Sequence, residues 1–132
     1  MAPAYMKLLQ ETKQKNQKYL NLDEQGLKEV PLEICDLDFL VKLNLSNNYI
    51  SEITTDIHKL NKLEILSLYC NRLSQLPALF NRMQSLQRLT LSNNSITELP
   101  PGFGTIPNLE YLDLSVNKIS SISSNFGYLS KF

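Results

Sequence analysis

The sequence predicts an α/β fold, a right-handed solenoid with a parallel sheet on its concave face and short helical or 3₁₀ turns on its convex face. The main observation is an eleven-residue phrase that recurs every 23 residues without insertion, because a fixed period of this length is typical of stacked repeats. Its copies begin at Gln17, Leu40, Leu63, Leu86 and Leu109. The second observation is alternation within each copy, where positions 4 and 6 are leucine in all five repeats. Such alternation predicts a strand with one buried face.

Position 9 of the phrase is asparagine in the last four copies: Asn48, Asn71, Asn94 and Asn117. An amide side chain offers two donors and an acceptor, so it can satisfy backbone groups where the chain turns out of the sheet. We expect a buried structural ladder here rather than a ligand site. The first copy has Gln25 instead, which suits an atypical terminal repeat.

The second half of each repeat predicts the convex turns. Positions 14, 18 and 21 are apolar in every copy. Pro31, Pro77 and Pro100 follow position 14 in three copies, and proline there disfavours a regular helix that begins earlier. Short helical or 3₁₀ turns are therefore expected.

Residues 1–16 are predicted to form an N-terminal capping helix, ahead of a solenoid of five repeats at 17–132. Tyr5, Leu8, Leu9 and Thr12 have helical spacing among good helix formers. Such a helix would cover the open end of the core. Binding to a membrane surface is the alternative, and the short apolar face disfavours it.

The C-terminal end suggests an alternative role. Phe132 stands at the first position of a sixth copy, and no polar capping segment follows it. The last repeat would then expose the core around Leu112, Leu114, Ile119 and Phe126. We expect either a truncated chain or an end that another protein covers. The alternative function is a structural module that self-associates through this uncapped repeat.

Composition narrows the classes of partner and the compartment. Thirteen basic and thirteen acidic residues balance, so no net field attracts nucleic acid or an anionic membrane. The start of the chain lacks the apolar run of a signal peptide, and no stretch approaches the length of a membrane helix. Cys35 and Cys70 occupy positions on opposite sides of the solenoid, out of disulfide reach. A cytoplasmic location is expected.

Catalytic and metal-binding signals are weak. Cys35 and His58 share position 19 in neighbouring repeats, with Asp36 and Asp56 nearby. A structural zinc site requires four well-placed ligands, so this cluster is not expected to bind metal. With a single histidine and no convergent acid pair, nothing supports catalysis or a cofactor.

Positions 3, 5, 7 and 8 are expected to face outward on the concave sheet. Aromatic residues and arginine are the types enriched at interface hot spots. The predicted protein-binding residues are Tyr19, Lys42, Ile65, Tyr69, Arg88, Tyr111 and Asp113. Ile65, Tyr69, Arg88 and Tyr111 are expected to lie together as a patch. The alternative is a solvated sheet face whose tyrosines only reflect strand propensity.

The full unit LxxLxLxxNxLxxLPxxFxxLxx resembles the intracellular, Ras-group class of leucine-rich repeats. The opening MKLLQETKQKNQKYLNLDEQGL and the segment PPGFGTIPNLEYLDLSVNKI are similar to Ras-suppressor members of that class. The resemblance implies a scaffold or signalling adaptor. It also implies a partner that is a LIM-domain adaptor at integrin adhesions or a component of the Ras pathway. No binding residues are transferred from the family.

Overall fold

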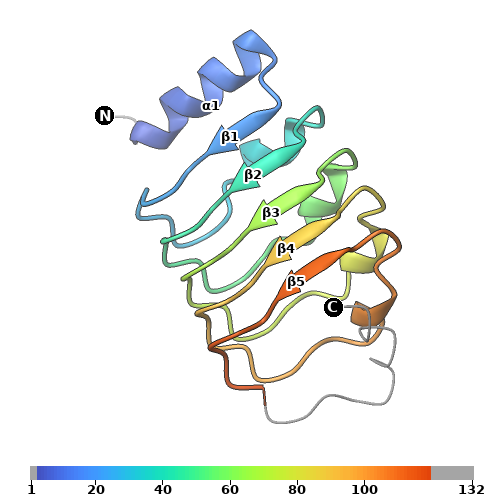
Figure 1. Cartoon of the computed structure of the whole chain (residues 1–132). Helices are drawn as coiled ribbons and strands as arrows, with labels where there is room; N and C mark the ends of the chain where they lie inside the picture. The colour runs from blue at the N-terminus through green and yellow to red at the C-terminus, as the bar shows by residue number, and fades with distance from the viewer. Residues whose placement is uncertain (1–2, 120–132) are drawn as a thin grey trace.

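Five parallel strands form one sheet in chain order (Figure 1). The structure is a computed structural model that describes residues 3–119. The strands are β1 (Tyr19–Asn21), β2 (Lys42–Asn44), β3 (Ile65–Ser67), β4 (Arg88–Thr90) and β5 (Tyr111–Asp113). Each residue pairs with the residue one period later, as Tyr19 does with Lys42 and Arg88 with Tyr111. The predicted solenoid and its parallel sheet are confirmed.

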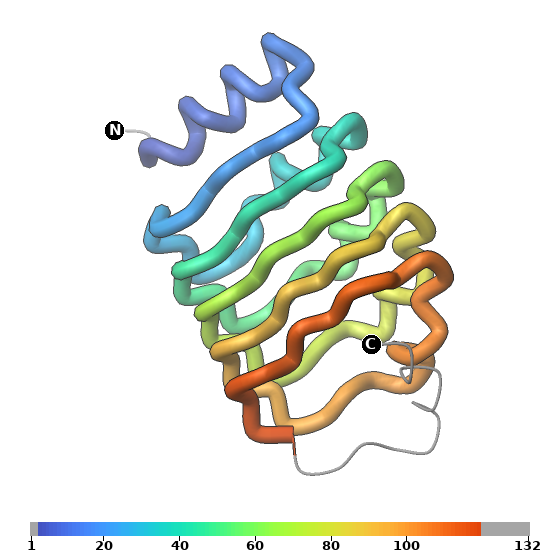
Figure 2. The backbone as a smooth tube through the Cα atoms, in the orientation of Figure 1, coloured from blue at the N-terminus to red at the C-terminus, as the bar shows by residue number. Residues whose placement is uncertain are grey.

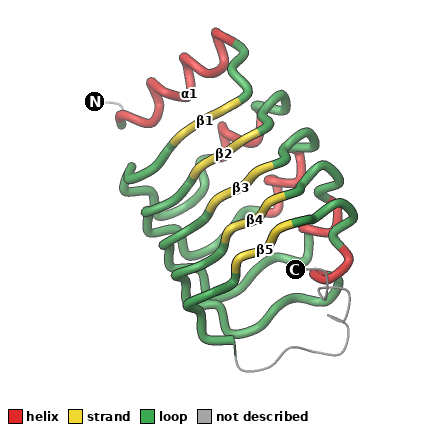
Figure 3. The backbone as a smooth tube through the Cα atoms, viewed as in Figure 1, coloured by secondary structure: helices red, strands yellow, loops and turns green. Residues whose placement is uncertain are grey.

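Short 3₁₀ turns lie on the side opposite the sheet (Figure 3). They are η1 (Leu32–Asp36), η2 (Thr55–Lys59), η3 (Phe80–Arg82) and η4 (Phe103–Thr105). Pro31 directly precedes η1, and Gly102, with a φ of 80°, directly precedes η4. Glycine adopts this left-handed conformation without a steric penalty. The predicted convex turns are confirmed.

The core lies between the sheet and the 3₁₀ turns. The central leucine of each inner strand is fully buried, as are Leu45 and Leu68 just beyond the strands. On the convex side Phe80 and Phe103 pack edge to face, with ring centroids 5.9 Å apart at 74°. This geometry is favourable for aromatic rings because of their quadrupoles. One continuous apolar core therefore joins the successive repeats.

The helix α1 (Ala4–Lys15) lies beside β1 at the N-terminal end of the sheet (Figure 2). Leu9 and Thr12 are its buried residues, and the Thr12 hydroxyl donates to the Leu8 carbonyl at 2.8 Å. The helix ends at Asn16, which has a φ of 49°, a conformation that asparagine tolerates. Among the described helices, none has both the length and the apolar character needed to span a membrane.

The last described repeat packs less completely than the inner ones. Leu112, Leu114 and Ile119 are half-buried against the core, whereas the equivalent residues one repeat earlier are fully buried. Phe126 and Phe132, which the sequence places at the end of the core and at a sixth repeat, lie outside the described residues.

Position 8 of the repeat adopts the left-handed conformation throughout. The residues are Glu24, Asn47, Cys70, Asn93 and Val116, with φ between 54° and 57°. Asn47 is half-buried, and its Nδ2 donates to Asp23 Oδ1 at 2.9 Å in the preceding repeat. The left-handed residue turns the chain out of the sheet, and asparagine is favoured there because it tolerates positive φ.

Val116→Asn is expected to raise the free energy of unfolding by about 1 kcal/mol. Val116 is β-branched at a φ of 54° and its side chain is 72% exposed, so the strain is not offset by burial. Urea denaturation followed by circular dichroism measures the change. Val116→Ala is the control, because it removes the branch but keeps Cβ and should give a smaller gain. A stability equal to or below wild type for the asparagine variant would contradict the strain argument.

Candidate functional site

The strand register aligns position 3 of all five repeats into one row across the exposed face of the sheet. We call this the position-3 row: Tyr19, Lys42, Ile65, Arg88 and Tyr111. Tyr19 is 44% exposed and Tyr111 43%. Five of the seven predicted binding residues therefore share one line across the sheet, with an aromatic residue at each end.

Two cation–π pairs flank the centre of the row. Lys42 Nζ lies 4.8 Å from the Tyr19 ring centroid, and Arg88 Cζ lies 4.6 Å from that of Tyr111. Ile65 is half-buried on β3 between them. At exposed sites such pairs contribute about 0.5–1 kcal/mol each, which favours a defined position for both cations. From β1 to β5, the side chains of the row are therefore aromatic, cationic, aliphatic, cationic and aromatic.

Position 5 shapes the ends of the strands rather than an open surface. The side-chain oxygens of Asn21 and Asn44 accept the backbone amide two residues later. Asp113 Oδ1 likewise accepts from the Ser115 amide at 3.0 Å and from its hydroxyl at 2.6 Å. The hydrogen bond from the Ser115 side chain, followed by that from its amide, lowers the pKa of Asp113. This predicted binding residue is therefore an ionised carboxylate already engaged in the turn.

The expectation that position 7 faces outward is wrong for Ser46 and Ser92, which are 7% and 4% exposed. Asn44 Oδ1 holds the Ser46 amide at 2.9 Å, and the Ser46 hydroxyl lies 2.7 Å from that of Ser67 in the next repeat. The chain is already turning at this position, so a small side chain fits between neighbouring repeats. Ser115, at the same position of the last described repeat, is exposed, so burial at position 7 differs between repeats.

Tyr69, which also occupies position 7, lies apart from the rest of its predicted patch. It is 40% exposed, and its hydroxyl accepts from Asn93 Nδ2 at 3.2 Å. Within the described chain, no ring contact or hydrogen bond links Tyr69 to Ile65, Arg88 or Tyr111. Position 7 follows position 3 by four residues, about 13 Å along an extended strand. Tyr69 therefore lies where the chain turns out of the sheet, not in the row. We call this region, positions 7 to 10 of the repeat, the turn edge.

A third aromatic–cation pair, at this edge of the sheet, was not predicted from the sequence. Arg72 Cζ lies 4.6 Å from the ring centroid of Tyr49, which is 50% exposed. Tyr49 also lines a surface depression of about 420 Å³, together with Glu24, Gly26, Asn47, Asn48 and Cys70. Both residues occupy position 10, so reading that position across the recurring phrase would have found the pair.

The position-9 asparagines connect neighbouring repeats. Asn71 is 8% exposed, and its Oδ1 accepts from the Ile50 amide at 3.0 Å. Its Nδ2 donates to the Leu45 carbonyl at 3.0 Å and to the Leu68 carbonyl at 3.1 Å. Equivalent bonds are made by Asn48, Asn94 and Asn117. Backbone groups occupy the donors and the acceptor of these side-chain amides, so the contacts of the ladder are structural.

Cys35 and Cys70 do not form a disulfide with each other. Cys35 is buried, whereas Cys70 is half-buried at the turn edge. Burial, together with the nearby Asp56 carboxylate, raises the pKa of Cys35 to about 11. Both effects disfavour the thiolate, so this thiol is protonated at neutral pH and is a poor nucleophile or metal ligand.

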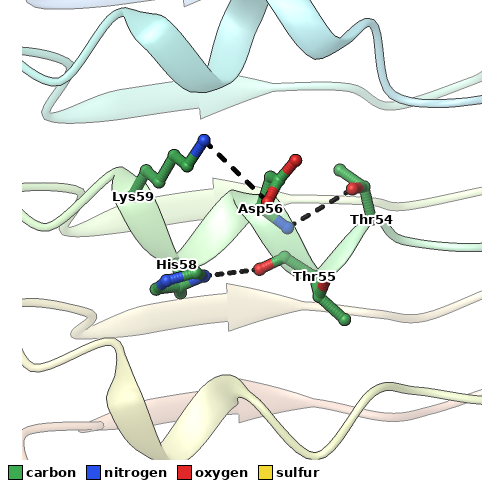
Figure 4. Close-up of polar contacts among 5 residues, drawn as sticks. All are labelled: Thr54, Thr55, Asp56, His58 and Lys59. Atoms are coloured by element: carbon green, nitrogen blue, oxygen red, sulfur yellow. Dashed lines mark hydrogen bonds and ion pairs between the residues drawn. The ribbon is translucent and has the colours of Figure 1, made fainter.

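The polar groups near His58 engage each other within η2 (Figure 4). His58 Nδ1 lies 2.6 Å from the Thr55 carbonyl oxygen, and the Asp56 amide donates to Thr54 Oγ1 at 3.3 Å. Lys59 Nζ lies 3.9 Å from the Asp56 carboxylate. Within residues 3–119, no three histidine, cysteine or acidic side chains are placed to share a metal ion. This cluster maintains a turn.

Comparison with known families gives two overlapping matches. Residues 12–95 match the family described as "Leucine-rich repeat region", and residues 84–127 match "Leucine Rich repeats (2 copies)". No curated protein sequence matches the chain.

Similar solved structures extend over almost the whole chain. A leucine-rich-repeat protein of Leptospira interrogans is 31% identical, with a TM-score of 0.73, over 98% of this chain and 38% of that one. The leucine-rich repeat domain of a Shigella effector is 26% identical, with a TM-score of 0.70, over 90% and 49%. That of the type III effector XopL is 24% identical, with a TM-score of 0.82, over 98% and 47%.

The chain spans less than half the length of each of these structures. The likeness therefore concerns the repeat architecture, which the sheet register and the asparagine ladder explain. On the family match over residues 12–95, the chain belongs to the leucine-rich-repeat family.

Proposed function

We propose that this chain is a non-catalytic protein-binding scaffold or signalling adaptor that docks its partner on the concave face. Leucine-rich-repeat domains generally mediate protein–protein interactions and are typically not enzymes. The observation that supports the concave face is the position-3 row, where a tyrosine–cation pair lies on each side of Ile65.

The row has the physical properties of a binding hot spot. Tyrosine and arginine are the residue types over-represented where truncation costs most binding energy. Arg88 and Lys42 are already stacked on rings, so less side-chain entropy is lost when a partner binds. A solvated face that served only the sheet would not require this pairing of cations with rings.

The setting of the adaptor is proposed from sequence resemblance. The Ras-group form of the repeat phrase supports a cytoplasmic signalling role, with a LIM-domain adaptor or a Ras-pathway component as partner. The distinctive support is limited to the N-terminal segment and the turn at 100–104, PPGFG. Imaging of the tagged chain together with an adhesion marker tests both the compartment and the integrin setting.

Arg88→Glu combined with Tyr111→Ala is expected to reduce partner capture from a lysate at least about tenfold. The two changes reverse one cation and remove the ring on which it stacks. Quantitative mass spectrometry of the captured proteins measures the loss, and circular dichroism checks that the fold is retained.

A matched control carries Lys62→Glu and Leu32→Ala, both on exposed residues outside the sheet face. This variant should retain every protein that the wild-type chain captures. Equal capture by the concave variant, or equal loss in both variants, would contradict docking on the concave face.

A further inference from the structure

Position 10 of the repeat forms a row of its own along the turn edge, and Gly26, Tyr49 and Arg72 are its first three members. The Tyr49 amide donates to the Leu27 carbonyl at 2.7 Å, and the Arg72 amide donates to the Ile50 carbonyl at 2.9 Å. Each of these bonds joins a position-10 residue to the residue that follows position 10 in the preceding repeat. The backbone of Gly26 therefore lies next to that of Tyr49, on the side away from Arg72.

The place of Gly26 in this row is open. Its φ of 68° suits glycine, which adopts a left-handed conformation without a steric penalty. A Cβ atom at Gly26 would have no neighbouring atom within 4 Å. Gly26 and Tyr49 both line the depression of about 420 Å³ at the turn edge, whereas Arg72 does not line it. A part of the Tyr49 ring that the Arg72 side chain does not cover therefore borders an unfilled space.

The Tyr49–Arg72 pair shows which chemistry this ring accepts. Arg72 Cζ lies 4.6 Å from the Tyr49 ring centroid, so one side of the ring already holds a guanidinium. Both faces of an aromatic ring carry the negative end of its quadrupole, and both attract cations. Two cations on one ring repel each other, and a carboxylate beside the second one offsets this repulsion. Glu24 lines the same depression and supplies that carboxylate.

The charge around Gly26 also favours a cation. Glu24 lines the first depression, and Gly26 also lines a neighbouring one of about 410 Å³ together with Lys28, Glu29 and Glu33. The three glutamates are exposed, and none of them forms an ion pair within the described chain. Three carboxylates and one amine give this surface a net negative charge, although the whole chain is neutral. It therefore attracts a basic segment rather than an acidic one.

We propose that the space bordered by Glu24, Gly26 and Tyr49, which we call the Gly26 slot, binds an arginine side chain from a basic segment of a partner protein. The guanidinium stacks on the Tyr49 ring, and its N–H groups donate to the Glu24 carboxylate. Arginine fits better than lysine, because its planar fork can both stack on a ring and pair bidentately with a carboxylate. The slot lies outside the position-3 row, so this second surface goes beyond the proposed docking on the concave face.

The test uses three labelled peptides that differ at two positions of a glycine- and serine-rich sequence. The first has arginine at both positions, the second has lysine, and the third has citrulline, which keeps the planar shape of arginine without its charge. Fluorescence anisotropy at low ionic strength, where exposed charges are least screened, measures their binding. The arginine peptide should bind at least about threefold more tightly than the lysine peptide. It should bind at least about tenfold more tightly than the citrulline peptide.

Tyr49→Leu should weaken binding of the arginine peptide at least about threefold, because it removes the ring and keeps apolar bulk. Tyr49→Phe is the matched control, since it keeps the ring faces and should bind within about twofold of the wild-type chain. Glu24→Gln should weaken binding of the arginine peptide more than that of the citrulline peptide. Its control, Glu98→Gln, makes the same change on an exposed glutamate outside both depressions and should alter neither. Circular dichroism checks that each variant is folded.

Equal binding of the arginine and lysine peptides would overturn the inference, because it would show attraction to an acidic surface without a guanidinium site. Equal binding by Tyr49→Leu and Tyr49→Phe would also overturn it, as would equal losses in Glu24→Gln and Glu98→Gln.

Two-dimensional NMR of the isotopically labelled chain locates the bound peptide. The arginine peptide should cause its largest amide shifts at Gly26, Leu27 and Tyr49. Shifts centred on the position-3 row would reject the slot. These results are independent of the test of concave docking, which measures the proteins captured by the Arg88→Glu, Tyr111→Ala variant, so either proposal can fail while the other stands.

Discussion

Asn71→Ala is expected to lower the free energy of unfolding by about 3 kcal/mol, because several buried backbone groups lose their partners together. The Ile50 amide loses its acceptor, and the Leu45 and Leu68 carbonyls lose their donor. Asn71 is 8% exposed, so water cannot readily replace the amide. Urea denaturation followed by circular dichroism measures the loss.

Asn61→Ala is the matched control, since it makes the same chemical change on an exposed turn residue whose side chain takes part in no described hydrogen bond. Its effect should stay within about 0.5 kcal/mol, as for ordinary surface substitutions. A loss below about 1 kcal/mol for Asn71→Ala, or one equal to that of the control, would show that the ladder does not support the solenoid.

The ladder explains why the repeats depend on their neighbours. Each asparagine bonds the carbonyl at position 6 of its own repeat and that of the preceding one, as Asn94 does with Leu91 and Leu68. Solenoid stability is largely a sum of intrinsic repeat terms and nearest-neighbour interface terms. A ladder substitution therefore weakens an interface between two repeats rather than one repeat alone.

The sheet and the convex turns were predictable because the period fixes them. A strand residue such as Leu43 has its partner one period later at Leu66, so register follows from the repeat length. The buried positions also follow from the period, because every repeat has the same backbone path and equivalent side chains point into the core each time. The prolines after position 14 excluded longer convex helices in the same way.

Side-chain exposure at the turn edge was harder to predict, because it depends on the backbone conformation there and not on the alternation of polar and apolar residues. Strand parity places position 7 outward, yet the turn buries Ser46 and leaves the larger Tyr69 exposed. Position 8 takes a positive φ in every described repeat, and no polarity pattern reports φ. The Tyr49–Arg72 pair depends on this geometry too, because the turn brings position 10 of adjacent repeats together.

The proposed binding surface uses positions that the repeat consensus leaves free. A likeness at 24–31% identity does not transfer the side chains of the position-3 row. The order of two rings, two cations and one isoleucine belongs to this chain. Comparing the proteins captured by the wild-type chain and by the Arg88→Glu, Tyr111→Ala variant is therefore more informative about the partner than fold similarity.

Phe80→Ala is expected to have the largest effect on stability, a loss of about 4 kcal/mol in the free energy of unfolding. Phe80 is 1% exposed and packs edge to face on Phe103 at 5.9 Å. The substitution removes the buried ring and its aromatic contact, and it leaves a cavity between η3 and η4 that rigid neighbouring repeats cannot fill. Urea denaturation measures the loss, and Phe80→Leu should recover more than half of it because leucine refills most of the volume.

Phe39→Ala is the control, because Phe39 is only half-buried and stacks with Lys18 at 5.9 Å from its ring centroid. Its loss should be no more than about 2 kcal/mol, in proportion to the smaller area removed from water. The comparison separates the contribution of the closed convex core from that of an aromatic ring as such. Equal losses at Phe80 and Phe39 would mean that the convex layer, like the surface, tolerates cavities, and that the strands and the asparagine ladder alone hold the solenoid together.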